Sequence, residues 1–301
     1  MTLSQKAFAK INLGLRILER LPDGYHTIET VFVELAWGDT LYAEPAPELH
    51  FQSRGLPVPP DDNNLVIQAA RLLQRTTGCK QSANITLEKS IPLGSGLGGG
   101  SSDAAATLLL LPRLWGINVK EDAVASMARL LGADVPFFLR GNIAYATGIG
   151  DKLYPVEWGF QGWIVLYYPG WEVSTPWAYR KWDLLAGRGL INPPSRTSQT
   201  PANPLKDYLD RILGGPEFRE HFVNDFEPIV FEEFPALKKV YDQFWETGAD
   251  HVGLSGSGSS LFGLFWDYEI ALKAYQWAKR LGWACLTQRR KDASRETSEA
   301  G

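Results

Sequence analysis

The segment from Pro92 to Ala106 most constrains what this chain can become. It reads PLGSGLGGGSSDAAA and holds five glycines within seven residues. Ordering glycine is entropically costly, so such a run indicates left-handed turns or a close approach of the backbone. An apolar helical pattern over 101–116 follows directly, with Ser and Asp residues typical of a helix cap at its start. Unpaired amides and the helix dipole at such a junction favour anions, so we predict a polyphosphate cradle.

Known phosphate and catalytic motifs limit what this cradle can be. A Walker A loop ends in Gly-Lys-Ser/Thr, which the segment lacks. Gly94-x-Gly96-x-x-Gly99 fits the dinucleotide fingerprint and leaves a nicotinamide-dependent oxidoreductase as an alternative. A Rossmann unit would continue as alternating strands and helices, whereas a second helical pattern follows the first here. The protein-kinase motifs His-Arg-Asp and Asp-Phe-Gly, the G-x-S-x-G elbow and His-Glu-x-x-His do not occur in the sequence.

Charge and cysteine content exclude several other classes. The 301 residues carry 30 Lys and Arg against 34 Asp and Glu, a net charge of −4, whereas nucleic-acid and anionic-membrane surfaces are basic. Two cysteines, Cys79 and Cys285, are too few for a zinc module or a disulfide scaffold. The N-terminus alternates like a strand and has no long apolar stretch. We therefore expect a cytoplasmic protein that binds neither nucleic acid nor membranes. As a separate expectation, the protein is a monomer or a weak homodimer.

Helical and strand patterns are mixed along the chain without regular alternation, which predicts an α+β fold. Strand patterns cover 8–18, 27–37, 39–53, 83–89, 142–147, 162–168, 250–254, 260–266 and 282–288, and helical patterns cover 64–77, 101–116, 119–131, 175–185, 204–213, 235–246 and 267–280. A turn-rich stretch over 148–160 predicts a first domain over 1–154 and a second over 155–288. We expect a polar surface insert at 187–204 and a disordered tail at 289–301.

Three segments, taken together, resemble the GHMP kinases, the group that includes galactokinase and the homoserine and mevalonate kinases. PLGSGLGGGSSDAAA is similar to their central motif, AKINLGLRI (9–17) to their N-terminal motif, and GLSGSGSSLFGLF (253–265) to their C-terminal glycine motif. The three occur in the expected order over nearly the whole chain. The resemblance implies two domains, one similar to ribosomal protein S5 domain 2 and one ferredoxin-like, with the site between them.

The resemblance also implies which residues bind ATP and carry out phosphoryl transfer. Lys10 and Asp134 match the catalytic positions, although residue patterns alone would suggest a solvent-facing lysine and a helix-capping aspartate. The expected ATP-binding residues are Pro92, Leu93, Gly94, Ser95, Gly96, Leu97, Gly98, Gly99, Gly100, Ser101, Ser102, Asn64, Leu65 and Lys89. Ser255, Gly256 and Gly258 would close the phosphate end. No protein metal site is implied, because Mg²⁺ would be held mainly by phosphates and water.

Two further segments are similar to the GHMP kinases whose acceptor is an alcohol joined to a cytidine diphosphate. These are PDGYH (22–26) with ETVF (29–32), and GADVPFF (132–138). The resemblance implies that Tyr25 and Tyr179 sandwich the cytosine, that His26 bonds its edge, and that Asn12 and Thr175 complete the acceptor site. Without it, Tyr25 and His26 would be a surface aromatic and a solvated histidine. A kinase for another small alcohol and a catalytically silent binding protein stay open as alternatives.

Overall fold

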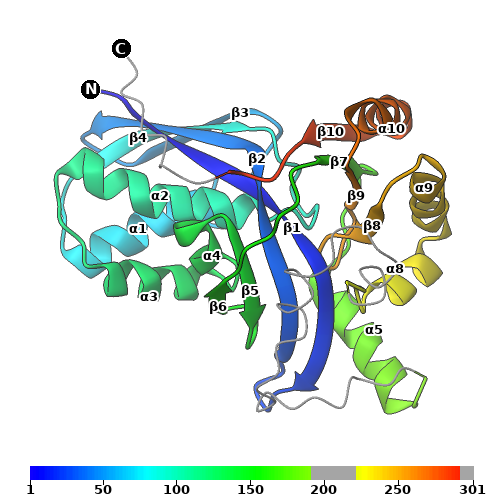
Figure 1. The fold of residues 1–301 in the computed structure, drawn as a ribbon. Helices are drawn as coiled ribbons and strands as arrows, with labels where there is room; N and C mark the ends of the chain where they lie inside the picture. Colours follow the sequence, from blue (N-terminus) through cyan, green and yellow to red (C-terminus); the bar gives the residue numbers. More distant parts are fainter. Residues whose placement is uncertain (191–221, 292–301) are drawn as a thin grey trace.

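A computed structural model describes residues 1–190 and 222–291 of the chain. Two long antiparallel strands, β1 (Leu3–Arg20) and β2 (His26–Ala46), run through the whole molecule as a hairpin (Figure 1). The strands predicted over 8–18 and 27–37 are confirmed and extend further at both ends. Register shifts between Phe8 and Lys10 and between Leu13 and Leu15 bend β1 where it passes from one domain to the next.

The first sheet is built around β2. Its order is β3 (His50–Gly55), β4 (Ser82–Lys89), β2, β5 (Ile143–Thr147) and β6 (Lys152–Pro155), and β1 pairs with the other edge of β2. Four helices cover one face: α1 (Leu65–Thr77), α2 (Gly99–Trp115), α3 (Glu121–Leu131) and α4 (Val135–Arg140) (Figure 1). Their apolar residues pack on the sheet in one core. Asn64 and Gly78 bound α1, as the sequence predicts.

The start of α2 differs from the expectation. The helix begins at Gly99, its N-cap residue is the left-handed Gly98, and no side chain caps it. Asp103 is buried in the helix instead of capping it. The α2 helix is followed by α3 and α4 before the chain returns to β5, which is antiparallel to β2. The parallel strand–helix–strand unit that a dinucleotide fingerprint requires is therefore not formed here, and the oxidoreductase alternative is wrong.

The second sheet is antiparallel with the order β10 (Trp283–Thr287), β7 (Trp163–Tyr168), β9 (Leu261–Phe265) and β8 (His251–Leu254). Counted from β7, this is the strand order 4-1-3-2 of a ferredoxin-like fold. Its helices are α5 (Thr175–Gly187), α8 (Glu227–Glu233), α9 (Pro235–Glu246) and α10 (Tyr268–Leu281). The predicted α+β fold with two domains is confirmed, because each of the two sheets has its own set of helices. The predicted helix over 204–213 lies outside the described residues, as does most of the insert at 187–204.

The middle of β1 belongs to both halves of the molecule. Ile11 and Leu13 are fully buried in a cluster that includes Phe222, Phe262 and Leu264. At the far end of the chain, residues 288–290 return to β2: Ala36 N donates to Gln288 O, and Arg290 forms a 2.9 Å ion pair with Glu34. Part of the predicted disordered tail is therefore ordered, because its first arginines have partners on β2. Residues 292–301 lie outside the described part of the chain.

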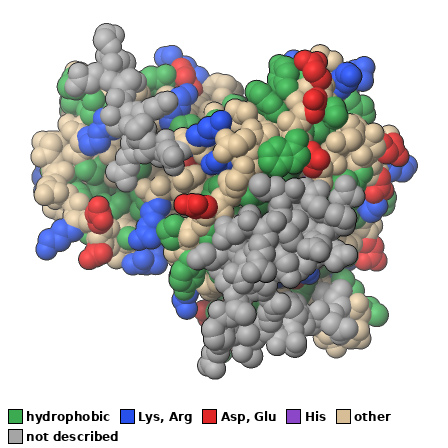
Figure 2. All heavy atoms as spheres, viewed as in Figure 1, with side chains coloured by type: hydrophobic (Ala, Val, Ile, Leu, Met, Phe, Trp, Pro, Cys, Tyr) green, Lys and Arg blue, Asp and Glu red, His purple; other side chains and the backbone are tan. Residues whose placement is uncertain are grey.

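The surface of the described residues carries mixed charge. Figure 2 shows acidic and basic side chains interspersed on this face without a large patch of one sign. Across residues 1–190 and 222–291, every helix is too short or too polar to traverse a bilayer.

Candidate active site

A cavity of about 810 Å³ lies where β1, the glycine-rich loop, the start of α4 and α5 meet. It brings together most residues predicted for the site: Lys10, Asn12, Tyr25, His26, Leu65, Pro92, Leu93, Gly94, Ser95, Gly96, Gly98, Gly99, Gly100, Ser101, Asp134, Thr175 and Tyr179. Gly256, from the C-terminal glycine motif, lines it too. Residues that are far apart in sequence and were predicted to act on one substrate pair therefore share one space.

Four residues predicted to bind ATP do not line this cavity. Leu97 is buried in the apolar core, and the Oδ1 atom of Asn64 accepts a hydrogen bond from Val66 N as the cap of α1. Ser102 faces a different hollow of the first domain. Lys89 is enclosed behind the loop in ion pairs. These four side chains therefore pack in the core, cap a helix, face another hollow or form ion pairs, and their predicted contact with ATP stays a prediction.

Lys10 and Asp134 form the charged centre of the cavity. Lys10 Nζ lies 3.5 Å from Asp134 Oδ2, and their side chains are 5% and 33% exposed. Burial lowers the pKa of Lys10, and the nearby charge of Asp134 offsets part of this effect. Asp134 occupies the N-cap position of α4 but makes no capping hydrogen bond. Its carboxylate is therefore available to a ligand hydroxyl.

A short relay of side chains holds Lys10 in place. Alternate residues of a strand point to the same face, so Lys10 and Asn12 both face the cavity. Lys10 Nζ donates to Asn12 Oδ1, and Asn12 Nδ2 donates to Thr30 Oγ1 at 3.0 Å. The Thr30 hydroxyl in turn donates to Gly14 O at 2.6 Å. Because Thr30 is completely buried, the relay anchors the ammonium group to the backbone of the central hairpin.

Close contacts inside the protein require several glycines of the loop. A Cβ atom on Gly96 would lie 2.2 Å from Ser255 O, and one on Gly98 would lie 2.7 Å from Phe138 Cζ and 3.0 Å from Lys10 Cγ. Both glycines have left-handed backbones, with φ of 80° and 72°. The loop also accepts a hydrogen bond at Gly96 O from Ser255 Oγ, at 2.9 Å. The two glycine motifs therefore touch directly, which brings the second domain against the glycine-rich loop.

Behind the loop lies a buried charge cluster that the sequence analysis missed. Lys89 Nζ contacts Asp39 Oδ2 at 2.7 Å and Asp103 Oδ2 at 2.5 Å, and its side chain is 0% exposed. The other Asp39 oxygen accepts backbone hydrogen bonds from Ser90 and Ile91, where the loop begins. Burial opposes the charge on Lys89, but the two carboxylates outweigh it and raise its pKa. Burial also raises the pKa of Asp103, to about 7, and Asp39 adds to this effect against the attraction of Lys89.

The cluster ties three elements together beneath the predicted cradle. Asp39 comes from β2, Lys89 ends β4, and Asp103 lies in the second turn of α2. In the sequence, the cluster is indicated only by Asp103, an aspartate in an otherwise apolar helical segment, since a buried charge requires a partner.

The far end of the cavity differs from the predicted base sandwich. Tyr25 is 61% exposed. The Tyr179 ring stacks on His26, with ring centroids 4.6 Å apart and an angle of 12° between the planes. One face of Tyr179 is therefore already covered by His26. His26 Nε2 lies 2.7 Å from Asp183 Oδ1, a residue that the sequence analysis did not single out. Thr175 Oγ1 lies 2.8 Å from Ser257 Oγ and joins α5 to the second glycine motif.

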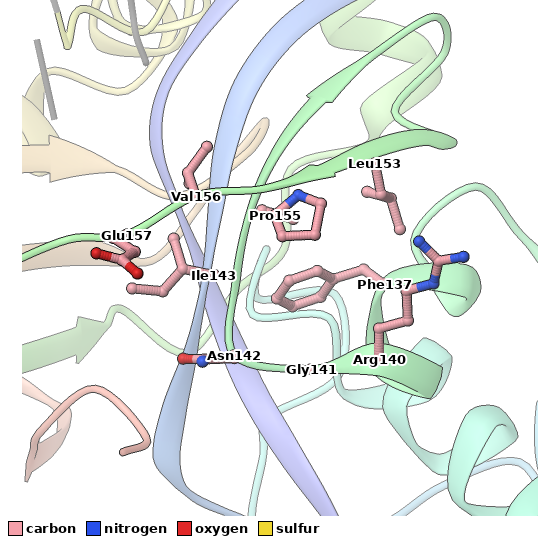
Figure 3. Close-up of a pocket in the computed structure, with 10 residues that line it drawn as sticks. Phe137, Arg140, Gly141, Asn142, Ile143, Leu153, Pro155, Val156 and Glu157 are labelled. Carbon is pink, nitrogen blue, oxygen red and sulfur yellow. The ribbon is translucent and has the colours of Figure 1, made fainter. Parts of the chain in front are cut away.

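A second cavity, of about 600 Å³, lies beside α4 and β5. Figure 3 shows Arg140 and Glu157 at opposite ends of it, with the apolar side chains of Phe137 and Pro155 between them. It contains none of the predicted site residues, and its charged groups do not converge. The larger cavity is therefore the candidate active site.

Comparison with known proteins identifies the two halves of the chain separately. The family described as GHMP kinases N terminal domain matches residues 64–142, and GHMP kinases C terminal matches residues 210–287. A curated relative from Prosthecochloris aestuarii is 42% identical over 267 residues, which cover 88% of this chain and 89% of that protein. A second relative, from Chloroherpeton thalassium, is 41% identical and covers 92% of this chain and 94% of that protein. Both are named 4-diphosphocytidyl-2-C-methyl-D-erythritol kinase.

Solved structures agree with this result. A crystal structure of 4-(cytidine 5'-diphospho)-2C-methyl-D-erythritol kinase superposes with a TM-score of 0.78 at 36% identity, covering 94% of this chain and 98% of that one. Mevalonate kinase of L. major in complex with R-mevalonate has a TM-score of 0.71 at 14% identity over 95% of this chain and 96% of that chain. At that low identity the likeness shows a shared fold alone.

Proposed function

The chain belongs to the 4-diphosphocytidyl-2-C-methyl-D-erythritol kinases among the GHMP kinases, and on that premise we propose which of its residues perform the reaction. It is an ATP-dependent kinase of the non-mevalonate route to isoprenoid precursors. The proposed reaction transfers the γ-phosphoryl group of ATP to the 2-hydroxyl of the erythritol unit. The observation that carries the assignment of residues is the Lys10–Asp134 pair, at 3.5 Å, in one cavity with the glycine loop and Tyr25.

Asp134 and Lys10 would act on the acceptor hydroxyl together. Asp134 orients the hydroxyl and accepts its proton as the oxygen attacks the γ-phosphorus. Lys10 lies beside the same position and stabilises negative charge on the attacking oxygen and on the transferred phosphoryl group. Support comes from the Asp134 carboxylate, which faces the cavity and makes no capping hydrogen bond. Further support comes from the hydrogen bonds through Asn12 and Thr30 that hold the ammonium group of Lys10 in place.

The triphosphate would lie along the glycine loop and the start of α2. Amides of the loop and of the first helical turn, with the Ser101 hydroxyl, are available as donors to phosphate oxygens. Mg²⁺ would be held mainly by phosphates and water, as its usual coordination favours.

The cytosine of the acceptor would bind at the Tyr25 and His26 end. The exposed Tyr25 ring supplies one stacking face, and base–aromatic stacking contributes about 1–3 kcal/mol. Tyr179 would support this site from beneath, through its stacking on the His26 ring. We propose that the enzyme needs only its small-molecule substrates and acts in the cytoplasm as a monomer or a weak homodimer.

One assay tests the acceptor directly. ADP release is measured with the cytidine diphosphate acceptor, with homoserine and with mevalonate, and we expect turnover with the first alone. Tyr25→Ala should raise KM for the cytidine acceptor about 5- to 150-fold while ATP KM scarcely changes, because only the stacking face is lost. Tyr25→Phe is the matched control and should behave like the wild type. An unchanged acceptor KM in Tyr25→Ala, or equal turnover of mevalonate, would refute the assignment.

A further inference from the structure

A carboxylate lies behind the histidine of the proposed base site. His26 begins β2, and its side chain is 2% exposed. Its Nε2 atom lies 2.7 Å from Asp183 Oδ1. The other Asp183 oxygen lies 3.5 Å from Arg20 Nε, on the last residue of β1. The histidine therefore faces the cavity with one ring nitrogen already engaged.

The ring has little freedom to turn. Tyr179 stacks on one face, and Trp182 meets the ring edge-on at 5.6 Å and 83°. Tyr179 and Asp183 are four residues apart on α5 and so lie on the same side of that helix. One helix therefore supplies the ring support and the hydrogen-bond partner together, and it sets the direction in which both nitrogens of His26 point.

The carboxylate also determines where the proton of the neutral imidazole sits. A carboxylate only accepts hydrogen bonds, so a bond to Asp183 requires the proton on Nε2. In that tautomer Nδ1 carries a lone pair and accepts. Among the residues that the structure describes, no group hydrogen-bonds Nδ1. The nitrogen left for a ligand is thus an acceptor.

We propose that Asp183 is a positioning residue that fixes His26 in the Nε2–H tautomer and so makes the base site select a pyrimidine with an amino group over one with an oxo group. Cytosine and uracil differ at this group: cytosine has an amine that donates, whereas uracil has a carbonyl oxygen that accepts. An accepting Nδ1 bonds the first and repels the second. The proposal rests on the proposed function, because it takes the base to be bound at Tyr25 and His26.

Three variants test this assignment. Asp183→Leu removes the acceptor, and Asp183→Asn offers Nε2 either an oxygen or an amide, so neither fixes the tautomer. Lys181→Gln is the matched control. Lys181 lies on α5, as Asp183 does, and the change breaks only its exposed 3.4 Å ion pair with Glu233 of α8. For each variant, kcat/KM is measured with the cytidine diphosphate acceptor and with its uridine counterpart. Long-range ¹H–¹⁵N spectra report the tautomer of His26, one of four histidines, assigned with His26→Gln.

We expect the wild type and Lys181→Gln to prefer cytidine and to show the Nε2–H tautomer. In both Asp183 variants the preference should fall about 2- to 12-fold, mainly through acceptor KM, and the tautomer signal should change. A variant that keeps both the preference and the tautomer refutes the role of Asp183. A wild type without preference for cytidine refutes the base site of the proposed function, while the spectra still decide whether Asp183 sets the tautomer.

Discussion

The buried ammonium group of Lys89 gives the sharpest quantitative test of how the phosphate loop is supported. We expect Lys89→Met to lower the free energy of unfolding by about 3–5 kcal/mol, because breaking a buried ion pair leaves an uncompensated charge. Here two carboxylates, 2.7 and 2.5 Å from Nζ, lose their shared partner, and side chains 0–5% exposed give water no access to replace it. The free energy of unfolding of a whole domain is about 5–15 kcal/mol, so the variant should still fold at 25 °C.

The loss should depend on pH in a definite direction. In the wild type, burial already raises the pKa of Asp103 to about 7, above its value in the unfolded chain. Removing Lys89 removes the attraction that holds this pKa down, so it rises further. Between pH 7 and 8 the folded variant then binds a proton that the unfolded chain does not. Its stability should fall by up to about 1.4 kcal/mol per pH unit, while that of the wild type changes less over this range.

Urea denaturation at pH 6, 7 and 8 measures this difference. The control is Lys89→Met with Asp103→Asn, which removes one of the two stranded charges and should recover part of the stability and the flat pH response. ATP KM should rise in the single variant and acceptor KM should stay constant, because the cluster lies beneath the glycine loop. A loss below about 1 kcal/mol, or one that is equal at pH 6 and 8, would show that the carboxylates do not depend on Lys89.

Three further outcomes are expected. Asp134→Asn should lower kcat about 10²- to 10⁴-fold and leave the KM for ATP within a few-fold of the wild type. Adding Lys10→Ala to this variant should lower kcat by much less than Lys10→Ala does alone, since the two residues act as a unit. Fully additive losses in stopped-assay kinetics would contradict this. Gly98→Ala should lower kcat and raise ATP KM, because its Cβ would lie 3.0 Å from Lys10 Cγ and its left-handed backbone costs about 1–2 kcal/mol. Gly187→Ala is the control, because Gly187 does not line the cavity and a Cβ there would meet no atom within 4 Å. Equal losses in both variants would reject the argument. Burial raises the pKa of Glu227 to about 7, so the contribution of this residue to stability falls as the pH rises from about 4.5 to 7. Glu227→Gln should therefore make the free energy of unfolding, measured by urea denaturation, depend less on pH in this range. An unchanged pH dependence would rule this out.

The sequence predicted the longer elements well because their periodicity and end signals are local. The helix predicted over 64–77 occurs at Leu65–Thr77, bounded by Asn64 and Gly78. Among the elements that the structure describes, the sequence missed α4, β6 and α8, which have six, four and seven residues. Such short segments do not complete enough turns or alternations to show a period. Their positions are set by tertiary packing, which a local pattern does not contain.

The site shows the same division between local and distant information. Lys10 and Asp134 were found by resemblance to a family, whereas the residue pattern alone favoured a helix cap for Asp134. The structure has Asp134 at the cap position with its carboxylate directed to Lys10, 3.5 Å away. Asp39 and Asp183 were not found, because their partners are 50 and 157 residues away in the chain. Only the folded backbone brings these pairs together.

The central hairpin also affects how the chain can fold during synthesis. Ile11 and Leu13 are made near the start, yet the cluster that covers them is completed by Phe262 and Leu264, roughly 250 residues later. At about 5–20 residues per second, a ribosome needs on the order of 10–50 s to reach them. During that interval the first domain holds an uncovered apolar strand face, which is a site for chaperone binding or aggregation. We therefore expect a fragment of residues 1–154, expressed alone, to be far less soluble than the whole chain. Separate expression of the two halves followed by mixing should recover little active enzyme.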